Sequence, residues 1–444
     1  MAQPQPHHTA LNLRGVELAG LDRIEEALRC FDDALALKPG DLDVRVNRAN
    51  VLALLGRWDA AEDEFRAVLR RTPRDAASLN GLGNCLKMRG AAEEARKSYA
   101  RAAAADPRNA DAWNNIGEVE KHLGHWYEAL LAYDRALGLA PRHRDALYGR
   151  ALVRLALGKW SGGFSDYRAR PAIQDPAGLT REPLPSDLSG RRIHVRLDQG
   201  LGDEIFFLRF LPALRARGAW VAYNSDPRLA PILARADIAD QIGPPNDAVD
   251  HCIAVGDLPH VLGFAERDVP PSIGLSGLPE RIAQVRTALA AFGPPPYLGV
   301  AWRAGTPNER KALFKEIDRT ALARVLGRSR ATVIAVQRRP QAGEVAAFAA
   351  ALGRPVLDLS TANDDLETIL ALTGVLDDYV CVSNTNVHLR AAQGRRSRVL
   401  VPHPAEFRWM AEGDSPWFPG TVVYRQDAGG DWTAALDRLA GDLG

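Results

Sequence analysis

The sequence predicts an α-helical solenoid in the first third of the chain, followed by an α/β region of two lobes that each contain a parallel sheet. Two observations support this prediction. Small residues, aromatic residues and prolines recur every 34 residues up to residue 141, and a fixed period of this size is the signature of stacked helical repeats. Beyond residue 190, short apolar runs alternate with amphipathic stretches, as strands and helices do in parallel sheets.

The composition is that of an ordinary globular protein and excludes several classes of function. Hydrophobic residues make up 46% and charged residues 25% of the chain. Its length of 444 residues is enough for about three folding units. The net charge is only +1, so nucleic acid is not an expected partner. No apolar run reaches the ~18 residues of a membrane span, the start MAQPQPHHTA lacks a secretory signal, and the four cysteines are scattered singly. We therefore expect a cytoplasmic protein with no disulfide framework, zinc site or other metal site.

Three kinds of residue mark the repeats at constant offsets. Small residues let two helices approach closely, aromatic rings fill the gap against the next repeat, and proline ends each second helix because it cannot continue one. The positions are Ala27, Ala61, Ala95 and Ala129; Phe31, Phe65, Tyr99 and Tyr133; Pro39, Pro73, Pro107 and Pro141; and Gly15, Gly83 and Gly117, with Ala49 at the missing step. This lattice resembles the tetratricopeptide repeat, a helix–turn–helix unit.

Four full repeats are expected over residues 8–141, and a degenerate fifth extends the solenoid domain to residues 8–170. The fifth keeps Ala151, Gly158, Trp160 and Tyr167 in phase but has Gly163 where the alanine belongs. We expect this last repeat to be a cap or the join to the next domain.

Asparagines gather on the predicted first helices, which line the concave face of such solenoids. An amide can both donate to and accept from a peptide backbone, so a ladder of amides could hold an extended polypeptide. Repeat-bearing O-linked N-acetylglucosamine transferases are similar in using such a ladder. The alternative is that the asparagines cap turns and fill polar contacts between helices. The candidate acceptor-binding residues are Asn47, Asn80, Asn84, Asn114 and Asn115, with Asn12 and Asn50 at adjacent positions.

After a Pro- and Gly-rich linker at residues 171–190, two α/β series follow, divided by Gly293-Pro294-Pro295-Pro296. They predict two Rossmann-like lobes, residues 191–293 and 297–444, that face each other across a cleft. The expected strands are Ile193–Leu197, Ala219–Tyr223, Tyr297–Trp302, Thr332–Gln337, Val356–Leu359, Tyr379–Ser383 and Val399–Val401. The expected helices are Glu204–Ala216, Pro227–Ala234, Leu322–Leu326, Ala342–Leu352, Leu366–Thr373 and Val387–Ala392.

Three loops follow predicted strands, where ligands of parallel sheets bind. The first, Asp198–Asp203, has two glycines and free amides at a helix start, although Asp203 could simply cap the helix. The second, Trp302–Gly305, leads into a basic stretch, Arg310–Lys315, that could clamp a diphosphate or lie in solvent. The third, Ser383–Leu389, puts Asn384 and His388 on one helical face, although a single histidine there is more often structural.

The order of these motifs resembles bacterial proteins that fuse tetratricopeptide repeats to a heptosyltransferase-like glycosyltransferase domain (glycosyltransferase family nine) with the GT-B fold. The first loop resembles that family's QGLGD motif, and Phe210-Leu211-Pro212 its FLP motif. The remaining matches are Gly299–Trp302 with GLxW, Val336-Gln337 with a strand-end Gln, Ser383–Leu389 with DTxxxHL, and Ser415–Pro419, Arg425-Gln426 and Gly430–Trp432 with the SPWYP, RQ and GDW ending.

The resemblance implies an inverting, metal-independent transfer of a sugar from a nucleotide-sugar, which is a substrate, so no cofactor is expected. Asp203 would be the general base that takes the acceptor proton. Arg303 and Lys315 would neutralise the departing nucleoside diphosphate. The other nucleotide-sugar contacts would come from the same loops: Gln199, Gly200, Gly202, Trp302, Gln337, Asn384, Thr385 and His388.

The chain departs from the family pattern in the third loop. Asn384 stands where the family has Asp, and Arg390 replaces a usually small residue. Both changes add positive charge or remove negative charge, so we expect easier anion binding nearby. They also leave open a second interpretation, in which the chain is a repeat scaffold whose transferase-like domain transfers no sugar.

Overall fold

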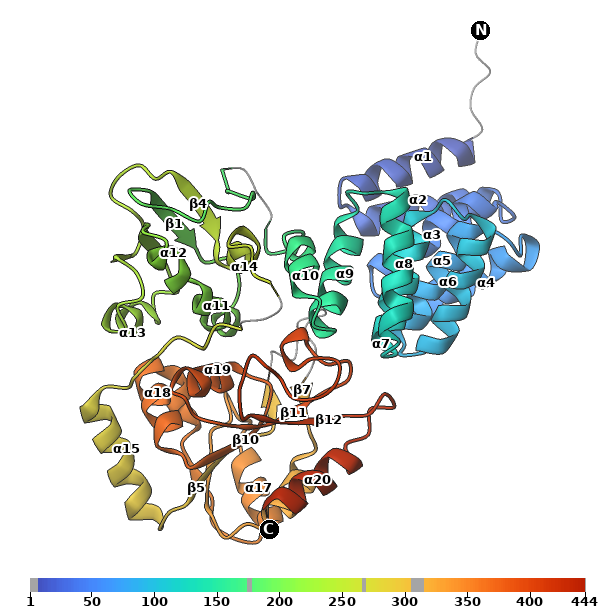
Figure 1. The fold of residues 1–444 in the computed structure, drawn as a ribbon. Helices are drawn as coiled ribbons and strands as arrows, with labels where there is room; N and C mark the ends of the chain where they lie inside the picture. Colours follow the sequence, from blue (N-terminus) through green and yellow to red (C-terminus); the bar gives the residue numbers. More distant parts are fainter. Residues whose placement is uncertain (1–6, 174–177, 266–268, 305–314, 444) are drawn as a thin grey trace. The chain divides into compact units, whose positions relative to one another are not determined.

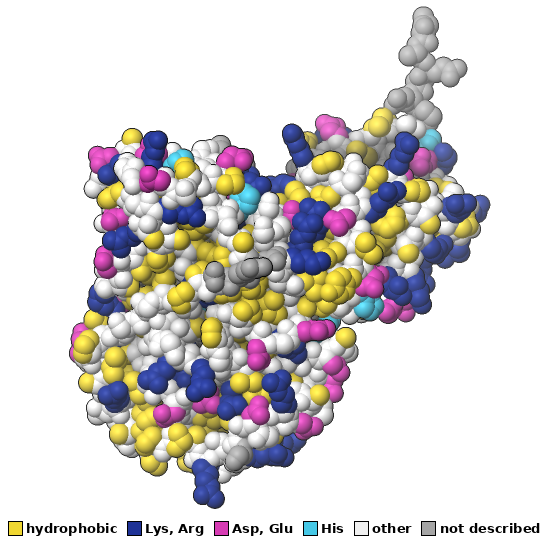
Figure 2. Space-filling view, in the orientation of Figure 1, with side chains coloured by type: hydrophobic (Ala, Val, Ile, Leu, Met, Phe, Trp, Pro, Cys, Tyr) yellow, Lys and Arg dark blue, Asp and Glu magenta, His cyan; other side chains and the backbone are white. Residues whose placement is uncertain are grey.

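The computed structural model describes residues 7–173, 178–265, 269–304 and 315–443. Its internal contacts divide the chain into two compact units, Met1–Arg150 and Ala151–Gly444. None of the helices in the described parts of the chain combines the length and the apolar character needed to cross a bilayer. Side chains of both charge signs are interspersed on the face shown in Figure 2.

The first unit is built from pairs of helices, each of which packs on its neighbours in the chain (Figure 1). First helices also contact the first helices of adjacent repeats, as α1 does α3 and α3 does α5. The helices are α1 (His7–Gly20), α2 (Ile24–Leu37), α3 (Leu42–Leu54), α4 (Trp58–Arg71), α5 (Ala76–Met88), α6 (Ala92–Ala105), α7 (Ala110–His122) and α8 (Trp126–Leu139), and α9 (Arg144–Ala156) runs across the unit boundary.

The residues that recur every 34 positions contact each other where the two helices of a repeat pack together. A Cβ added at Gly83 would lie 2.5 Å from the Tyr99 ring, and one added at Gly117 would lie 2.7 Å from the Tyr133 ring. Any side chain there would force the helices apart, because packed interiors have no room to give. The four lattice alanines are completely buried, as is Ala49. The predicted solenoid is therefore confirmed, and each lattice proline follows the end of a second helix by two residues.

Two further lattices explain the turns. Asp41, Asp75 and Asn109, 34 residues apart, cap α3, α5 and α7 by accepting from backbone amides at 2.8–3.2 Å. The turn inside each repeat needs a left-handed residue, which is Gly56, Gly90, Gly124 and Gly158 at φ from 72° to 81°. In the first repeat the same position is Asp22, at φ 60°.

Replacing Asp22 by glycine is expected to stabilise the repeat region by about 0.5 kcal/mol, because an exposed non-glycine residue in the left-handed region is strained. The reverse change, Gly90→Asp, should destabilise it by a similar amount, since a Cβ there meets open space and only the backbone strain changes. Urea denaturation of both variants measures the effect. Equal stability of Asp22→Gly and the wild type would show that the turn is not strained.

The second unit contains two parallel sheets (Figure 1). The first has the order β3-β2-β1-β4, and β1 pairs in parallel with β2 and β4. Its strands are β1 (Arg192–Arg196), β2 (Trp220–Asn224), β3 (Gln241–Ile242) and β4 (His251–Ala254). Its helices are α11 (Leu201–Phe207), α12 (Pro212–Ala216), α13 (Ala230–Arg235) and α14 (Leu258–Val261), with short 3-10 turns at Leu208–Phe210 and Val255–Asp257.

The second sheet has the order β12-β11-β10-β5-β8-β9. Its central strands are almost wholly buried, as expected where helices cover both faces. The strands are β5 (Tyr297–Ala301), β8 (Thr332–Ala335), β9 (Leu357–Asp358), β10 (Asp378–Val382), β11 (Arg398–Val401) and β12 (Val422–Arg425), and β6 (Arg303–Ala304) with β7 (Lys315–Glu316) forms a separate antiparallel pair. The helices are α15 (Pro279–Phe292), α16 (Arg319–Leu326), α17 (Glu344–Leu352), α18 (Leu366–Val375), α19 (Thr385–Ala392) and α20 (Thr433–Leu443), with 3-10 turns at Ser360–Asp364 and Phe407–Trp409.

Three predicted boundaries differ from the structure. The solenoid domain was expected over residues 8–170, with its fifth repeat as a cap or the join to the next domain; the contacts divide the chain within α9 and place α10 (Trp160–Tyr167) in the second unit, as a join would be. The reason is aromatic packing: Phe164 lies against Phe207, Phe210 and Trp417 with ring centroids 6.1–6.3 Å apart.

The second difference is α15, which was placed at the end of the first lobe but packs on α18 of the second sheet's layer. The third is the helix expected over Glu204–Ala216, which is broken into α11, a 3-10 turn and α12 because Pro212 cannot donate within a continuous helix. The linker is a strap along the first lobe in its described part, where the Thr180 and Leu184 amides donate to the Cys252 and Val261 carbonyls, both at 2.7 Å.

Arg390, whose charge was expected to ease anion binding nearby, is a buried structural residue. Its guanidinium is buried and donates to four backbone carbonyls, those of Thr373, Leu376, Asp377 and Arg396, at 2.6–3.1 Å. Three of these carbonyls, those of Thr373, Leu376 and Asp377, lie at or just past the end of α18, where a helix leaves carbonyls without partners. The departure from the family pattern at this position is therefore a structural one.

Candidate functional site

A cavity of about 620 Å³ lies in the second unit where strands of both parallel sheets end at their carboxyl side. Its walls come from the loops that follow β1, β2, β5, β8, β10 and β11, together with Asn363 after β9 and the start of α18. Six of the lining residues are Arg or Lys and two are carboxylates, counted among the residues that the structure describes. The cations are Arg228, Arg303, Lys315, Arg338, Arg339 and Arg408, and the carboxylates are Asp203 and Glu406.

The first and third loops both line this cavity, and they pack against each other where α11 and α19 begin. A Cβ added at Gly202 would lie 3.5 Å from both the His388 ring and the Thr385 hydroxyl, and α11 packs on α19. Glycine therefore allows the first turn of α11 to sit against the first turn of α19. Gly200 enters the turn in extended backbone conformation and also lines the cavity.

Asp203 lies on the cavity wall with a side chain that is 31% exposed, and its Oδ1 forms an ion pair with Arg408 Nη2. The neighbouring Glu204 points the other way. It is completely buried and accepts from the Tyr223 hydroxyl at 2.8 Å, and burial raises its pKa to about 7. Of these two adjacent carboxyls, only Asp203 can reach a molecule in the cavity.

The two predicted cations are brought together by the β6–β7 pair, in which Ala304 lies opposite Lys315. Lys315 Nζ pairs with Glu406 Oε1, while Glu406 Oε2 accepts from the Ser383 hydroxyl at 3.0 Å. The rest of the predicted basic stretch, including Arg310 and Lys311, and Gly305 lie outside the described residues.

Arg303 forms an ion pair with Glu344, with 3.0 Å between Arg303 Nη2 and Glu344 Oε2. Burial acts to raise the pKa of Glu344, but bonds from the Trp302 indole, the Gln341 amide and Arg303 outweigh burial and lower it. An ionised Glu344 fixes the direction of the guanidinium while leaving Arg303 on the cavity wall. Glu344 is thus a positioning residue that sequence reasoning missed.

Three predicted nucleotide-sugar contacts have other roles. Trp302 is completely buried, stacked on Phe348 at 4.7 Å, and does not line the cavity. Gln337 reaches the wall, but its Oε1 accepts from the Trp302 and Arg303 amides and its Nε2 donates to the Arg303 and Arg338 carbonyls, all at 3.0–3.1 Å. Its amide is fully used in joining the ends of β5 and β8. Gln199 does not line the cavity, and its Oε1 accepts from the Tyr167 hydroxyl at 2.8 Å.

The third loop begins α19 at the cavity. Asn384 is the N-cap, with its Oδ1 accepting from the Asn386 amide at 2.9 Å and its Nδ2 donating to the Tyr379 hydroxyl at 3.3 Å. A neutral cap leaves the positive end of the helix dipole uncompensated, which favours a bound anion. Thr385 and His388 line the cavity beside it.

His388 is a neutral residue of this wall. Burial, with help from Arg209 and Lys315, lowers its pKa to about 3. Its Nδ1 has no hydrogen-bond partner among the described residues. The ring can therefore donate or accept one hydrogen bond but does not act as a cation.

The depressed pKa makes stability depend on pH in a defined direction. The unfolded chain binds a proton at His388 below its ordinary pKa of 6.5 and the folded chain does so only near 3, so stability is lost as pH falls through that window. Between pH 7 and pH 5 the wild type should lose about 2 kcal/mol more than His388→Asn. Urea denaturation followed by tryptophan fluorescence measures this difference. Parallel pH profiles for the two proteins would show that the imidazole titrates freely in the folded state.

Several lining residues were missed by sequence reasoning. Arg338 and Arg339 directly follow β8, and Glu406 and Arg408 follow β11. The rule that loops at the carboxyl ends of parallel strands carry the ligand would have included all four. They belong to no recognised motif, which is why they were passed over.

Among the described residues, no group of three His, Cys, Asp or Glu side chains could hold a metal ion.

Four asparagines of the first unit form two pairs across adjacent first helices. Asn47 donates to Asn12 and Asn115 donates to Asn80, each at 2.9 Å. Asn84 accepts from the Tyr99 hydroxyl at 2.7 Å. These amides are partly exposed and retain further donors and acceptors.

Asn114 differs because it is only 7% exposed. Its amide lies within the packing of the repeats and does not present a surface to a peptide.

The fold and site together define a repeat protein with an appended α/β domain. The profile of the tetratricopeptide repeat family matches residues 12–76, 55–110, 86–124 and 122–176, so the N-terminal region is made of tetratricopeptide repeats. A curated relative, Protein FlbA of Caulobacter vibrioides, is 25% identical over 316 residues, which cover 63% of this chain and 51% of FlbA. The chain thus spans about half the length of that relative.

Solved structures with similar repeats cover less of the chain. TTC0263, a tetratricopeptide repeat protein of Thermus thermophilus, is 24% identical and matches 38% of this chain and 92% of its own with a TM-score of 0.35. MamA is 18% identical over 35% of this chain and 91% of its own (TM-score 0.32). YrrB, described as having an unusual peptide-binding site, is 21% identical over 37% and 84% (TM-score 0.30).

Proposed function

We propose that the second unit is a GT-B glycosyltransferase domain that moves a sugar from a nucleotide-sugar to an acceptor, with inversion and without a metal. The observation that carries this proposal is the cavity itself, in which one carboxylate from the first lobe faces a group of cations from the second. A nucleoside diphosphate requires fixed positive charge, and an attacking hydroxyl requires a base within hydrogen-bond reach. Asp203, Arg303 and Lys315 all line this cavity, so both requirements can be met within it.

In this proposal Asp203 removes the proton of the acceptor hydroxyl as its oxygen attacks the anomeric carbon. The bond from that carbon to the diphosphate oxygen breaks, and the electron pair leaves with the diphosphate. Arg303, Lys315 and the first amides of α19 stabilise the charge that develops there. Fixed cations take the place that a metal ion has in other transferases.

Arg408 can pair either with the Asp203 carboxylate or with a bound diphosphate. It pairs with Asp203 in the cavity, and its guanidinium also lies over the Phe206 ring at 5.0 Å, which holds it at the mouth of the first loop. A guanidinium binds phosphate as readily as carboxylate. We infer that an entering diphosphate draws Arg408 away from Asp203, which frees the carboxylate to act as a base.

The same ion pair supports a second candidate function, a repeat scaffold that binds a nucleotide but transfers no sugar. If Arg408 remains on Asp203, no base is available. Incubating the full chain with UDP-, ADP-, GDP- and CMP-sugars in EDTA separates the two candidates. A transferase should be stabilised against heat by one nucleotide class. It should also hydrolyse that nucleotide-sugar slowly, with water in place of the acceptor, and so release the nucleoside diphosphate or monophosphate. A scaffold should show the thermal shift without release, and no shift with any donor would contradict both.

We further propose that the first helices of the repeats recruit a polypeptide acceptor. Tetratricopeptide repeats commonly bind peptides or proteins, and the asparagine pairs supply amides that can bond to an extended backbone. Removing both members of one pair avoids leaving an orphaned partner. Asn80→Ala with Asn115→Ala should therefore raise the KM for the acceptor about tenfold, as expected for the loss of one or two net hydrogen bonds.

The control for this pair is Glu94→Ala with Lys97→Ala, which removes two exposed side chains of the second helix α6 without changing the net charge. This control should have the KM of the wild type. A double asparagine variant with unchanged acceptor KM would assign the pairs to helix packing.

A further inference from the structure

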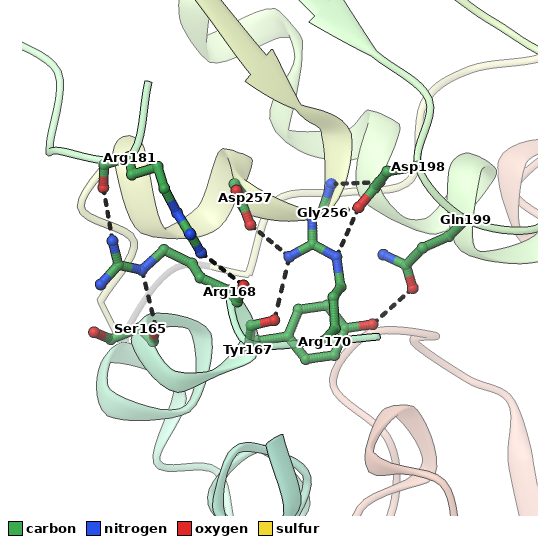
Figure 3. Close-up of polar contacts among 9 residues, drawn as sticks. All are labelled: Ser165, Tyr167, Arg168, Arg170, Arg181, Asp198, Gln199, Gly256 and Asp257. Carbon is green, nitrogen blue, oxygen red and sulfur yellow. Dashed lines mark hydrogen bonds and ion pairs between the residues drawn. The ribbon is translucent and has the colours of Figure 1, made fainter. Parts of the chain in front are cut away.

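Residues at the end of the last repeat form hydrogen bonds with the segment that directly precedes the candidate base, Asp203. The Tyr167 hydroxyl, at the end of α10, donates to Gln199 Oε1 at 2.8 Å. Arg170, three residues further, bonds to Asp198 and to Asp257 (Figure 3). Asp198 and Gln199 directly precede the Gly200–Asp203 turn.

These contacts form a buried ionic cluster. Arg170 is 1% exposed and Asp257 is completely buried. Arg170 Nε donates to Asp198 Oδ2 at 2.7 Å and Nη1 to Asp257 Oδ1 at 2.5 Å, and Asp198 Oδ1 accepts from the Gly256 amide at 3.3 Å. Burial alone would lower the pKa of Arg170, but Asp257 and Asp198 outweigh burial and raise it. One guanidinium therefore fixes two loops that follow β1 and β4.

The cluster is closely fitted around Gly256. A Cβ there would lie 2.6 Å from Gln199 Nε2 and 2.9 Å from Arg170 Cζ. Gln199 Nε2 is buried with no hydrogen-bond partner among the described residues. The side chain of Gln199 is thus anchored through its oxygen, by Tyr167.

We propose that Tyr167 and Arg170 are positioning residues for Asp203, so that the last repeat is part of the transferase site. This inference rests on the proposed function. Only the N-cap Gly200 and the helical residues Leu201 and Gly202 separate Gln199 from Asp203, which lies in the first turn of α11, and the two glycines have no side chains to pack this turn in place. The two repeat residues hold it from one side. Misplacing a catalytic group by about 1 Å can cost a hundredfold in rate.

The test uses Tyr167→Phe, which removes one hydroxyl and keeps the ring and its packing. Hydrogen exchange of the full chain should be at least tenfold faster at residues 200–204 than in the wild type. With donor saturating, kcat should fall about tenfold while the KM for the donor stays within twofold. The matched control is Tyr424→Phe, which removes another buried hydroxyl, one bonded to Asp442 at 2.7 Å and outside the cavity. It should change neither quantity.

A second variant, Arg170→Lys, keeps the buried charge but cannot bond in a fork to both carboxylates. It should reproduce the faster exchange and the lower kcat. Wild-type exchange at residues 200–204 in both variants would overturn the inference. So would faster exchange with an unchanged kcat in an active enzyme. If the wild type transfers no sugar, the proposed function fails, and the exchange measurement still decides whether the last repeat holds the loop.

Discussion

Replacing Asp203 by asparagine is expected to lower kcat at least about a thousandfold and to leave the dissociation constant for the nucleoside diphosphate within about threefold. General-base catalysis contributes roughly a hundredfold to ten-thousandfold, and asparagine keeps the size of the side chain while losing its basicity. The cations proposed to hold the diphosphate, Arg303 and Lys315, come from the second lobe, so the substitution leaves them in place. Steady-state kinetics and isothermal titration of the same preparation measure the two quantities.

The matched control is Asp250→Asn. Asp250 also pairs with an arginine, Arg191, at 3.1 Å, but it precedes β4 and does not line the cavity. Its variant should transfer at the wild-type rate. An Asp203→Asn enzyme that keeps a tenth or more of the wild-type kcat would remove Asp203 from the role of base.

The double change Arg303→Met with Lys315→Met is expected to weaken binding of the nucleoside diphosphate by at least about a hundredfold. Each charge-assisted hydrogen bond contributes about 1.5–3 kcal/mol, and the two cations line the same cavity. Methionine fills much of the volume of either side chain without its charge. Isothermal titration with the nucleotide class selected by the donor panel measures the loss.

The control removes two exposed cations of the same lobe, Arg319→Met with Arg324→Met, on the outer face of α16. It makes the same change in net charge at a distance from the cavity. If both double variants weaken binding equally, the diphosphate responds to the overall charge of the lobe and the cavity cations have no special role.

Hydrophobic patterning was sufficient to predict the central strands of both sheets and the loops that end them. It located Asp203, Arg303, Lys315, Asn384 and His388 because loop position follows from strand order. It could not give the direction of a side chain. Gln337 and Trp302 stand at loop positions, yet the first is consumed by backbone amides and carbonyls and the second by the core.

Sequence reasoning placed α10 in a repeat that caps the solenoid or joins it to the next domain, but could not show which residues of that domain it packs on. Its repeat pattern is intact enough to match the tetratricopeptide family, but Phe164 and Tyr167 pack on aromatic residues far away in the sequence. Long-range packing of this kind has no local signature. The pairing of asparagines is similar, since Asn80 and Asn115 contact each other only once adjacent repeats have stacked.

A crystal structure of the full chain with its preferred nucleoside diphosphate tests the central claim most directly. We expect the diphosphate oxygens within hydrogen-bond distance of Arg303, Lys315 and the first amides of α19, with the Asp203 carboxylate on the side where the acceptor enters. A nucleotide bound outside this cavity, or an Asp203 side chain directed away from the diphosphate, would contradict the account.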